Sequence, residues 1–434
     1  MKTLSRPDNL IDAGPEALFP SLATIPGSVW LDSSLAVNGK GHTSIIASSP
    51  TMEIRLEGNC LTIRENGKPV IVEPSADIIA FLGRLTEIGE KTAIGYISYE
   101  AMSSLPGLDC SIATSPIPEA LFYIYDSVIK YDHTTGQYNP AQLETEFGID
   151  QNSSSAPDTV PARLTNQMAH DEYLSHVRQI KRHIAEGDIY QANFTCRFEA
   201  ESPADPFRIY RRLRELNPAP YGGFLNFGDF HILSSSPERM FYKKGNSITS
   251  SPIKGTIDRG ENQQEQTRNL NQLLNSAKDR AELLMIVDLV RNDLGKIART
   301  GTVSVDHLFR PEVYSSLIHL VADVSARTDR NTTITEICRA LLPGGSITGA
   351  PKKRAVEILN ELETVPRSVY TGCIGYISGD TADFNIAIRT MYCTGSTWYL
   401  HAGGGIVADS DPEAEYREML LKARNLFRAL GLEV

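Results

Sequence analysis

Residues 249–256 read TSSPIKGT and place Lys254 between an apolar residue and a glycine. Glycine allows a backbone to approach a ligand closely. A lysine that is desolvated at such a place loses its proton more easily, and its neutral amine is a nucleophile. On this stretch alone the alternative is an exposed lysine in a turn, because lysine is rarely buried.

Two groups of carboxylates have a spacing that suits a metal ion. Glu415, Glu418 and Lys422 fall at i, i+3 and i+7 of a predicted C-terminal helix and therefore share one face. Glu282 interrupts an apolar helical stretch, with two leucines directly after it. Carboxylates on two helices that face one cleft suit a hard divalent cation that keeps several waters. The alternatives are a solvated charged stripe and an exposed glutamate.

Further positions suit recognition of an anion. Arg389 lies in the apolar stretch FNIAIRT, which predicts a strand, and a buried arginine needs a carboxylate partner. That partner is either an acid of the protein or a ligand carboxylate held by both arms of the guanidinium. The glycines at 403–405 let backbone N–H groups approach an anion. The loop GGSITGA has the same property, and a helix is expected to begin after it at Pro351.

The elements that position these residues follow a change in composition. A helix is predicted from the apolar spacing in HDEYLSHVRQIKRHIAEG, and a strand from the alternation in DIYQANFTCRFEA. Residues 222–256 predict three short strands, and Ser276 is expected to cap a helix. A helix ending at Pro343, three more strands and a last helix complete the pattern. Strand clusters interrupted by helices predict an α+β fold with antiparallel sheets.

The chain is predicted to divide into a strand-rich region at 1–150, a linker at 151–162 and a second region at 163–434. The stretch IDQNSSSAPDTVPA at 149–162 is rich in Ser, Pro and Asn and lacks apolar periodicity, which is typical of a linker. Before it, runs such as SVWLDSS, MEIRLEG and AIGYISYE predict short strands.

Bulk composition narrows the classes of partner. The chain has 434 residues, a net charge of −11 and no long Lys/Arg run, which disfavours nucleic acid and anionic membranes. No apolar run is long enough to span a bilayer and the first residues lack a leader pattern, so a cytoplasmic protein is expected. The six cysteines form no C-x-x-C pair, which favours free thiols over disulfides or zinc sites.

Six stretches resemble, in order and spacing, the motifs of the chorismate-utilising enzymes. They are SSSPE (234–238), PIKGT (252–256), DRAELLMIVDLVRNDLG (279–295), PGGSITGAPK (343–352), FNIAIRT (384–390) and GGGIVADSDPEAEYREMLLKA (403–423). The family includes anthranilate synthase component I, aminodeoxychorismate synthase component I, isochorismate synthase and salicylate synthase. The resemblance implies two large antiparallel sheets packed as a sandwich, with helices on the outside.

The resemblance also implies roles for residues at matching positions. Glu238 would be the general acid that protonates the departing C4 hydroxyl of chorismate. Glu282 and Glu418 would bind Mg²⁺, with Asp279 and Glu415 supporting these two ligands or reaching the ion through water. Such an ion would clamp the ring carboxylate and draw electron density as the hydroxyl leaves.

Substrate recognition is implied for a second set of positions. Arg389 would clamp the enolpyruvyl carboxylate with help from Tyr370, and Lys422 would add positive charge near the ring carboxylate. His319 also stands at a family position, but its apolar surroundings favour a structural role. The full substrate-binding set is Arg389, Tyr370, Gly403, Gly404, Lys422, Thr256 and Gln191.

Two positions discriminate among the family members. Members that add water resemble one another in having a lysine base where this chain has Gln191, and glutamine cannot take a proton from water. Anthranilate synthase component I typically reads Pro-Ile-Ala-Gly-Thr, whereas this chain has Lys254 in place of the alanine, as aminodeoxychorismate synthase component I does. The resemblance therefore implies amination of chorismate at C4, toward p-aminobenzoate and folate, with Lys254 attacking C2.

Two alternatives stay open, and one partner is expected. The first alternative is anthranilate synthase component I, which aminates C2. The second is a non-catalytic subunit that binds chorismate or tryptophan, against which the complete set of acid, metal and clamp residues speaks. No segment resembles the G-x-C-x-G nucleophile motif, so ammonia is expected to come from glutamine through a separate amidotransferase subunit, component II.

Overall fold

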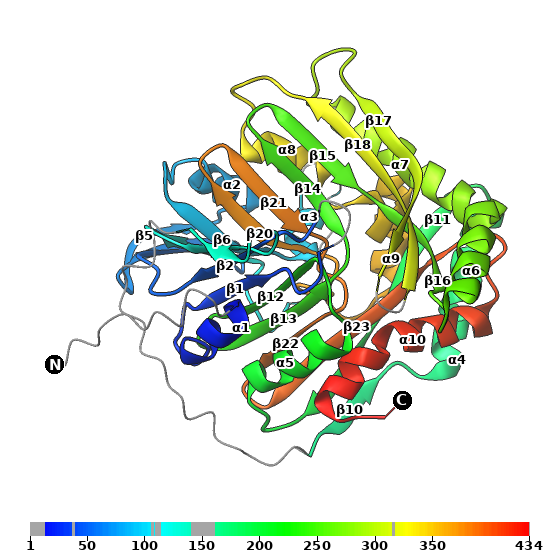
Figure 1. The fold of residues 1–434 in the computed structure, drawn as a ribbon, viewed down its shortest axis with the longest axis horizontal. Helices are drawn as coiled ribbons and strands as arrows, with labels where there is room; N and C mark the ends of the chain where they lie inside the picture. Colours follow the sequence, from blue (N-terminus) through cyan, green and yellow to red (C-terminus); the bar gives the residue numbers. More distant parts are fainter. Residues whose placement is uncertain are drawn as a thin grey trace.

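Two antiparallel sheets lie face to face and form the body of the protein, and helices cover their outer faces (Figure 1). The computed structural model describes residues 14–36, 40–105, 108, 114–139, 161–314 and 317–433. Within these residues one sheet has 11 strands and the other has 12. This arrangement confirms the predicted α+β fold with two large antiparallel sheets.

The 11-stranded sheet combines strands from both halves of the chain. Its members are β1 (Val29–Asp32), β2 (Thr43–Ala47), β8 (Ile129–Asp132), β9 (Gln137–Tyr138), β10 (Arg163–Gln167), β11 (Gln191–Glu201), β12 (Tyr221–Asn226), β13 (Phe230–Ser236), β19 (Gly349–Ala350), β22 (Thr390–Thr394) and β23 (Thr397–Ile406). Their order is β10-β11-β23-β22-β13-β12-β1-β2-β8-β9, and β19 pairs with β11.

The 12-stranded sheet is built in the same mixed way. Its members are β3 (Met52–Glu57), β4 (Cys60–Glu65), β5 (Lys68–Pro74), β6 (Thr92–Ile97), β7 (Ala120–Tyr125), β14 (Arg239–Lys244), β15 (Ser247–Ser251), β16 (Ile253–Asp258), β17 (Ser304–Val313), β18 (Leu317–Arg327), β20 (Cys373–Ser378) and β21 (Thr381–Asn385). Their order is β16-β18-β15-β14-β21-β20-β6-β7-β3-β4-β5, and β17 pairs with β18.

The helices of the described residues lie on the outer faces of the sheets (Figure 1). They are α1 (Pro15–Leu18), α2 (Ile78–Leu85), α3 (Tyr99–Ser103), α4 (His170–Ala185), α5 (Pro206–Leu216), α6 (Gln263–Asn275), α7 (Ala277–Gly295), α8 (Ile334–Leu341), α9 (Lys352–Leu362) and α10 (Pro412–Leu430), with short 3₁₀ turns at Phe19–Ser21 and Gly345–Ile347. None of them is long and apolar enough to cross a membrane.

Three apolar layers hold this sandwich together. The middle layer lies between the sheets and contains Tyr96 and Ile232 among its buried side chains. A second layer joins the 12-stranded sheet to α2, α7 and α8, and includes Phe81. The third joins the 11-stranded sheet to α4, α5, α9 and α10, and includes Trp398 and Phe427. Because side chains alternate along a strand, each strand contributes side chains to the apolar layer on either face of its sheet.

The N-terminal strands are not a separate layer, because β1 pairs with β12 and β6 pairs with β20. Both sheets therefore contain strands from each side of the predicted linker. The boundaries at 1–150, 151–162 and 163–434 stay a prediction, since residues 140–160 lie outside the described residues. Of the cysteines predicted to be free, Cys110 also lies outside them, and the other five are free as predicted.

Three local predictions need correction. Residues 222–256 form five strands, β12 to β16, instead of three, because tight turns of one to three residues separate short apolar runs. The stretch FNIAIRT is not one strand: β21 ends at Asn385 and β22 begins at Thr390, each in a different sheet. The helix after GGSITGA begins at Lys352, with Pro351 as its N-cap, one residue later than predicted.

Candidate active site

The lysine and the glutamine singled out in the sequence meet at one end of the two sheets. Lys254 lies on β16, at the edge of the 12-stranded sheet, and Gln191 begins β11 of the other sheet. A β-carbon built on Gly405 of β23 would lie 2.9 Å from Gln191 Nε2 and 3.4 Å from Lys254 Nζ. The ammonium and the amide therefore occupy the space above this glycine, which the sequence presented only as the third residue of a glycine run.

Gln191 is completely buried, and neither its Nε2 nor its Oε1 has a hydrogen-bond partner within the described residues. Leaving a buried amide unpaired costs free energy. This cost is removed when a ligand offers one donor and one acceptor at the same place. Gln191 is therefore suited to bind a polar ligand, as its place in the predicted substrate-binding set requires.

A β-bulge aims Lys254 into the site. Lys254 pairs with Leu320 and Thr256 pairs with His319, so Gly255 between them is the extra residue of the bulge, with φ of 71°. A β-carbon on Gly255 would lie 2.9 Å from the β-carbon of Asp279, so glycine lets β16 approach α7. Burial lowers the pKa of Lys254, although Glu282 opposes this effect.

Glu238 lies where the chain passes from β13 in one sheet to β14 in the other. Its side chain is 6% exposed, and the backbone N–H of Ile253 donates to its Oε1 at 3.4 Å. Burial raises its pKa to about 7, against the opposing charge of Lys254. A carboxyl group in this state keeps a proton near neutrality and donates it, as a general acid must.

Arg389 lies at the second passage between the sheets, between β21 and β22, and not within a strand as predicted. Its φ of 53° is uncommon for a residue with a side chain, and such backbone strain often marks functional positions. Its guanidinium donates to the carbonyl of Lys422. No described carboxylate lies within ion-pair distance of it, so the alternative of an internal salt bridge is not what the structure has.

Tyr370 and His319 lie close to this arginine. Tyr370 is buried, its ring stacks on His401 at 5.3 Å, and burial raises its pKa to about 12. His319 is buried and bonds through Nδ1 to the hydroxyl of Thr256 at 2.9 Å. Burial lowers the pKa of His319 to about 4, so the ring is neutral at physiological pH. Thr256 is exposed at this edge, next to the bulge.

Lys422 of α10 lies against the glycine run. Its Nζ donates to the carbonyl of Gly403 at 3.1 Å, and a β-carbon on Gly404 would lie 3.3 Å from this nitrogen. Residues 401–406 of β23 pair with β11 on one side, and β22 reaches only Leu400 on the other. One edge of the glycine run is therefore open to α10 and to a ligand.

The four predicted metal-binding carboxylates belong to two helices that flank Lys254. Glu282 of α7 lies 3.9 Å from the ammonium of Lys278, and Glu418 of α10 bonds to Lys422 at 2.8 Å. Glu415 accepts from the hydroxyl of Ser410 at 2.6 Å, and Asp279 lies at the first turn of α7, capped by Ser276. Burial raises the pKa of Glu415.

This carboxylate set has the chemistry that a hard divalent cation requires. Its donors are oxygen atoms and the side chain of Glu418 is 54% exposed, but Lys278 and Lys422 already pair with Glu282 and Glu418, so an ion would have to displace these lysines. The charges of both Glu282 and Glu418 act on Lys254, and those of Glu415 and Glu418 are opposed by Lys278. No three of these four described carboxylates gather within 4.8 Å of one another, so a magnesium ion between α7 and α10 stays a prediction that the donor chemistry supports.

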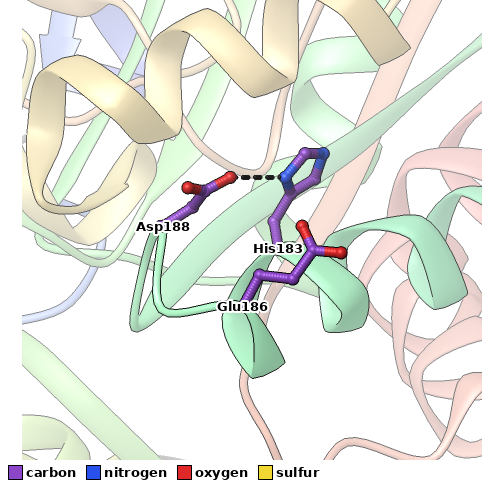
Figure 2. A group of neighbouring side chains, drawn as sticks. All are labelled: His183, Glu186 and Asp188. Atoms are coloured by element: carbon purple, nitrogen blue, oxygen red, sulfur yellow. Dashed lines mark hydrogen bonds and ion pairs between the residues drawn. The ribbon is translucent and has the colours of Figure 1, made fainter.

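The tightest group of metal-type side chains in the described part of the chain lies elsewhere, at the end of α4 (Figure 2). Figure 2 shows His183, Glu186 and Asp188, with His183 Nδ1 bonded to Asp188 at 2.8 Å. The same oxygen of Asp188 also accepts from Arg354 of α9 at 3.2 Å. Since a guanidinium already neutralises it, this cluster is an ion pair that joins two helices.

One supporting residue had no sequence signal that marked it. Arg367 is 2% exposed and donates to both oxygens of Glu363, to the carbonyl of Asn193 and to that of Ile347. It therefore ties β11, the loop before β19 and the end of α9 together. These contacts join segments far apart in sequence, which a linear pattern does not reveal.

A cavity of about 290 Å³ lies beside the N-terminal strands, lined by Asp32 and Ser33 of the WLDSS segment. Asp32 bonds to Arg214 at 2.6 Å and to Tyr210 at 2.9 Å, while its other oxygen is buried without a partner in the described structure. Arg239, next to Glu238 in sequence, lines the same cavity. Its volume and its unpaired carboxylate oxygen suit a small ligand that carries an ammonium group.

Known proteins are similar to this chain in fold and in sequence. Residues 34–428 match the family described as chorismate binding enzyme. Aminodeoxychorismate synthase component 1 of Bacillus subtilis is 36% identical, over 90% of each chain. Anthranilate synthase component 1 of Pseudomonas putida is 32% identical, over 96% of this chain and 93% of the relative. The crystal structure of anthranilate synthase component I from Streptococcus pneumoniae TIGR4 has a TM-score of 0.75 and 30% identity, covering 88% of this chain and 91% of that one.

Proposed function

The chain belongs to the family of chorismate binding enzymes, and from this premise we propose that it aminates chorismate at C4 to give 4-amino-4-deoxychorismate. The observation that carries the proposal is the ammonium of Lys254 above Gly405, beside the unpaired amide of Gln191. Glu238 supplies an acid nearby whose pKa is about 7. The relatives named aminodeoxychorismate synthase component 1 support the same reaction.

Binding uses Arg389, which no described carboxylate pairs with, and Lys422, which is paired with Glu418. Arg389 holds the enolpyruvyl carboxylate through two parallel hydrogen bonds, with Tyr370 beside it. Lys422 lies near the ring carboxylate, over the open edge of β23. When bound by Glu282 and Glu418, a magnesium ion would add charge stabilisation at the ring carboxylate as the hydroxyl leaves.

In the first half of the reaction the neutral amine of Lys254 attacks C2. Both ring double bonds shift by one position, the bond from C4 to its hydroxyl breaks, and Glu238 gives its proton to the departing oxygen, which leaves as water. The products are a cationic ammonium adduct at C2 and the carboxylate form of Glu238. The protein needs Lys254 to be neutral at this moment, which its lowered pKa favours.

In the second half ammonia attacks C4. The new C4–N bond forms, both ring double bonds shift back, and the bond between C2 and Nζ breaks with its electron pair returning to Lys254. Glu238 then takes one proton from the new ammonium group and regains its acidic form. Chorismate and ammonia are thereby converted to the aminated product and water, with both side chains regenerated. We further propose that ammonia derives from glutamine on a separate amidotransferase subunit.

The lysine step is tested by omitting ammonia. Wild type with chorismate and Mg²⁺ is expected to gain the mass of chorismate less one water, on the peptide that contains Lys254. Lys254→Ala should show no adduct, whereas the matched variant Lys244→Ala, at an exposed lysine of β14, should keep it. Formation of the C4 product without any adduct would leave Lys254 only an electrostatic role.

Product identity separates this function from the two alternatives. Fluorescent anthranilate formed by the wild type would indicate amination at C2, the reaction of anthranilate synthase component I. In the variant Lys254→Ala, by contrast, C2 is left open to ammonia. No consumption of chorismate would indicate a non-catalytic binding subunit. The C4 product is identified by chromatography, with and without a lyase that releases p-aminobenzoate.

A second binding function is favoured by the cavity beside β1. The unpaired oxygen of Asp32 suits the ammonium of an amino acid, and WLDSS is close to the tryptophan-binding segment typical of anthranilate synthase. We propose that this cavity binds such a ligand in addition to the catalytic function. Equilibrium dialysis with tryptophan tests this, and Asp32→Asn should abolish the binding that wild type shows.

A further inference from the structure

A small cavity of about 20 Å³ lies behind Glu238, on the side of α7. Its lining includes Glu238, Ser250, Val290, Asp293, Ser346 and Ile386. A space of roughly 10–15 Å³ already holds one molecule of the size of water. The cavity therefore has room for a single small molecule next to the proposed acid, and a substrate the size of chorismate does not fit.

We propose that this cavity admits neutral ammonia to C4 of the bound substrate. The inference rests on the proposed function and assigns the place from which its second substrate arrives. Ammonia is the one reactant of that function small enough for the space. It is also the reactant for which no side chain of the site has yet been assigned.

The course of the two displacements places ammonia on the side of Glu238. Attack at C2 expels the C4 hydroxyl, and attack at C4 then expels the lysine. Two displacements of the same stereochemical sense place the new C4–N bond on the face of the ring from which the hydroxyl left. Ammonia therefore enters C4 where the hydroxyl departed, which is the face that Glu238 protonated. The cavity touches this carboxyl group.

The same position completes the proton balance. After the first half Glu238 is a carboxylate, and the water it released has left C4. Ammonia that arrives past this carboxylate forms the C4–N bond and passes its extra proton to the neighbouring oxygen. No proton carrier other than Glu238 is needed, since its carboxyl group borders both the cavity and the reacting carbon.

The far end of the cavity favours ammonia over ammonium. Asp293 is buried there and bonds to Lys352 and Lys296, each at 2.7 Å. The side chain of Lys296 is 52% exposed, so this triad lies between the cavity and the surface. Of this triad only Asp293 lines the cavity, and the two ammonium groups bonded to it offset its charge, so this end offers little attraction to a cation. The remaining walls are mostly apolar, which also disfavours an ion.

A size series at one wall position tests the proposal. Val290→Ile adds a methylene that fills the cavity, and Val290→Ala enlarges it. Val287→Ile is the matched control, because Val287 is buried one turn earlier on α7 and does not line the cavity. Each variant is assayed for the KM of free ammonia, the KM of chorismate, and the rate of lysine adduct formation without ammonia. Thermal unfolding checks that each variant is folded.

We expect Val290→Ile to raise the KM of ammonia by about fivefold or more, equal to about 1 kcal/mol, with the KM of chorismate and adduct formation unchanged. Val290→Ala should leave the KM of ammonia equal or lower, and Val287→Ile should match wild type. An unchanged KM of ammonia across the series overturns the proposal. Slower adduct formation with an unchanged KM of ammonia also overturns it and assigns the cavity to the departing water. Failure of the proposed function appears separately, as a wild type that makes no C4 product.

Discussion

At the scale of single residues, the site depends on two groups whose burial moves their pKa values toward each other. The pKa of Glu238 is raised to about 7 and that of Lys254 is lowered. Pairs whose surroundings shift their pKa values in this way mark an acid and a base or nucleophile. Near neutral pH Glu238 therefore still holds its proton, while Lys254 loses its proton more readily than an ordinary lysine.

The acid is tested by Glu238→Gln. The amide cannot donate a proton, so adduct formation at Lys254 should slow by about 10²–10⁴-fold. In wild type the ionisation of Glu238 above about pH 7 should offset the gain from deprotonation of Lys254, whereas in the variant the rate should only rise with pH as Lys254 loses its proton. Single-turnover mass spectrometry without ammonia measures both, free of the pH dependence of ammonia itself. A variant with the wild-type rate would contradict the assignment.

The same substitution should stabilise the protein at alkaline pH. A carboxyl group whose pKa folding raises from its ordinary value of 4.5 to about 7 favours the folded state below pH 4.5 and loses this contribution as pH rises through 7. At one pKa unit per about 1.4 kcal/mol, Glu238→Gln should raise the free energy of unfolding by roughly 2–3 kcal/mol at pH 8. Urea unfolding at pH 4.5 and pH 8 measures the difference, which should nearly vanish at the lower pH.

Glu100 provides a matched control for this effect. It is a half-buried acid whose pKa desolvation also raises to about 7, and it accepts from the backbone N–H of Arg367 at 2.8 Å. Glu100→Gln should gain stability at pH 8 in the same direction without slowing adduct formation. If both variants are more stable at pH 8 but only Glu238→Gln loses adduct formation, the change in stability comes from burial and the change in reaction from the role of Glu238 as the acid.

At the scale of elements, two helices hold the carboxylates and two passages between the sheets hold the acid and the arginine. Glu418→Gln removes one charge from the face of α10 and should weaken binding of Mg²⁺ by about tenfold or more, together with binding of chorismate. Titration calorimetry with Mg²⁺, and activity at low Mg²⁺, measure this. Glu413→Gln, on the first turn of the same helix and paired with His170, is the control. Wild-type activity of Glu418→Gln at low Mg²⁺ would refute the ligand assignment.

Sequence patterns predicted most elements but not where the chain changes sheets. Alternation in FNIAIRT continues through β21 and β22, because both are buried and the pattern does not register which sheet each one joins. The break at Arg389 was therefore missed, although the residue itself was singled out. The strands between β12 and β16 were merged because the connections between them are only one to three residues long.

Site residues were predicted from motif resemblance and charge, and contacts across the fold were not. Lys254 stands out in the sequence between an apolar residue and a glycine, whereas Glu238 was singled out by resemblance to the family alone. Gly405 and Arg367 act through neighbours distant in sequence, such as Gln191 and Asn193 on β11. Only the pairing of β11 with β23 and the path of the loop at 343–348 reveal these roles.

At the scale of the whole molecule, the chain should supply one half of a two-subunit reaction. It carries no motif for glutamine hydrolysis, so the purified chain should not release ammonia from glutamine. Ammonium at high pH should support turnover, and glutamine should do so only after addition of an amidotransferase subunit. A coupled glutamate assay measures this, and glutaminase activity in the single chain would contradict it.

Because early and late strands are neighbours in both sheets, the order of synthesis affects how the protein folds as it leaves the ribosome. β1 and β6 are synthesised well before their partners β12 and β20. Until those partners appear, their edges are open templates for wrong pairing, a condition that nascent-chain chaperones relieve. The glycine run of β23 and the carboxylates of α10 follow every other part of the site in sequence. The site is thus assembled only after α10 has been synthesised, and a chain cut short before α10 is expected to be inactive.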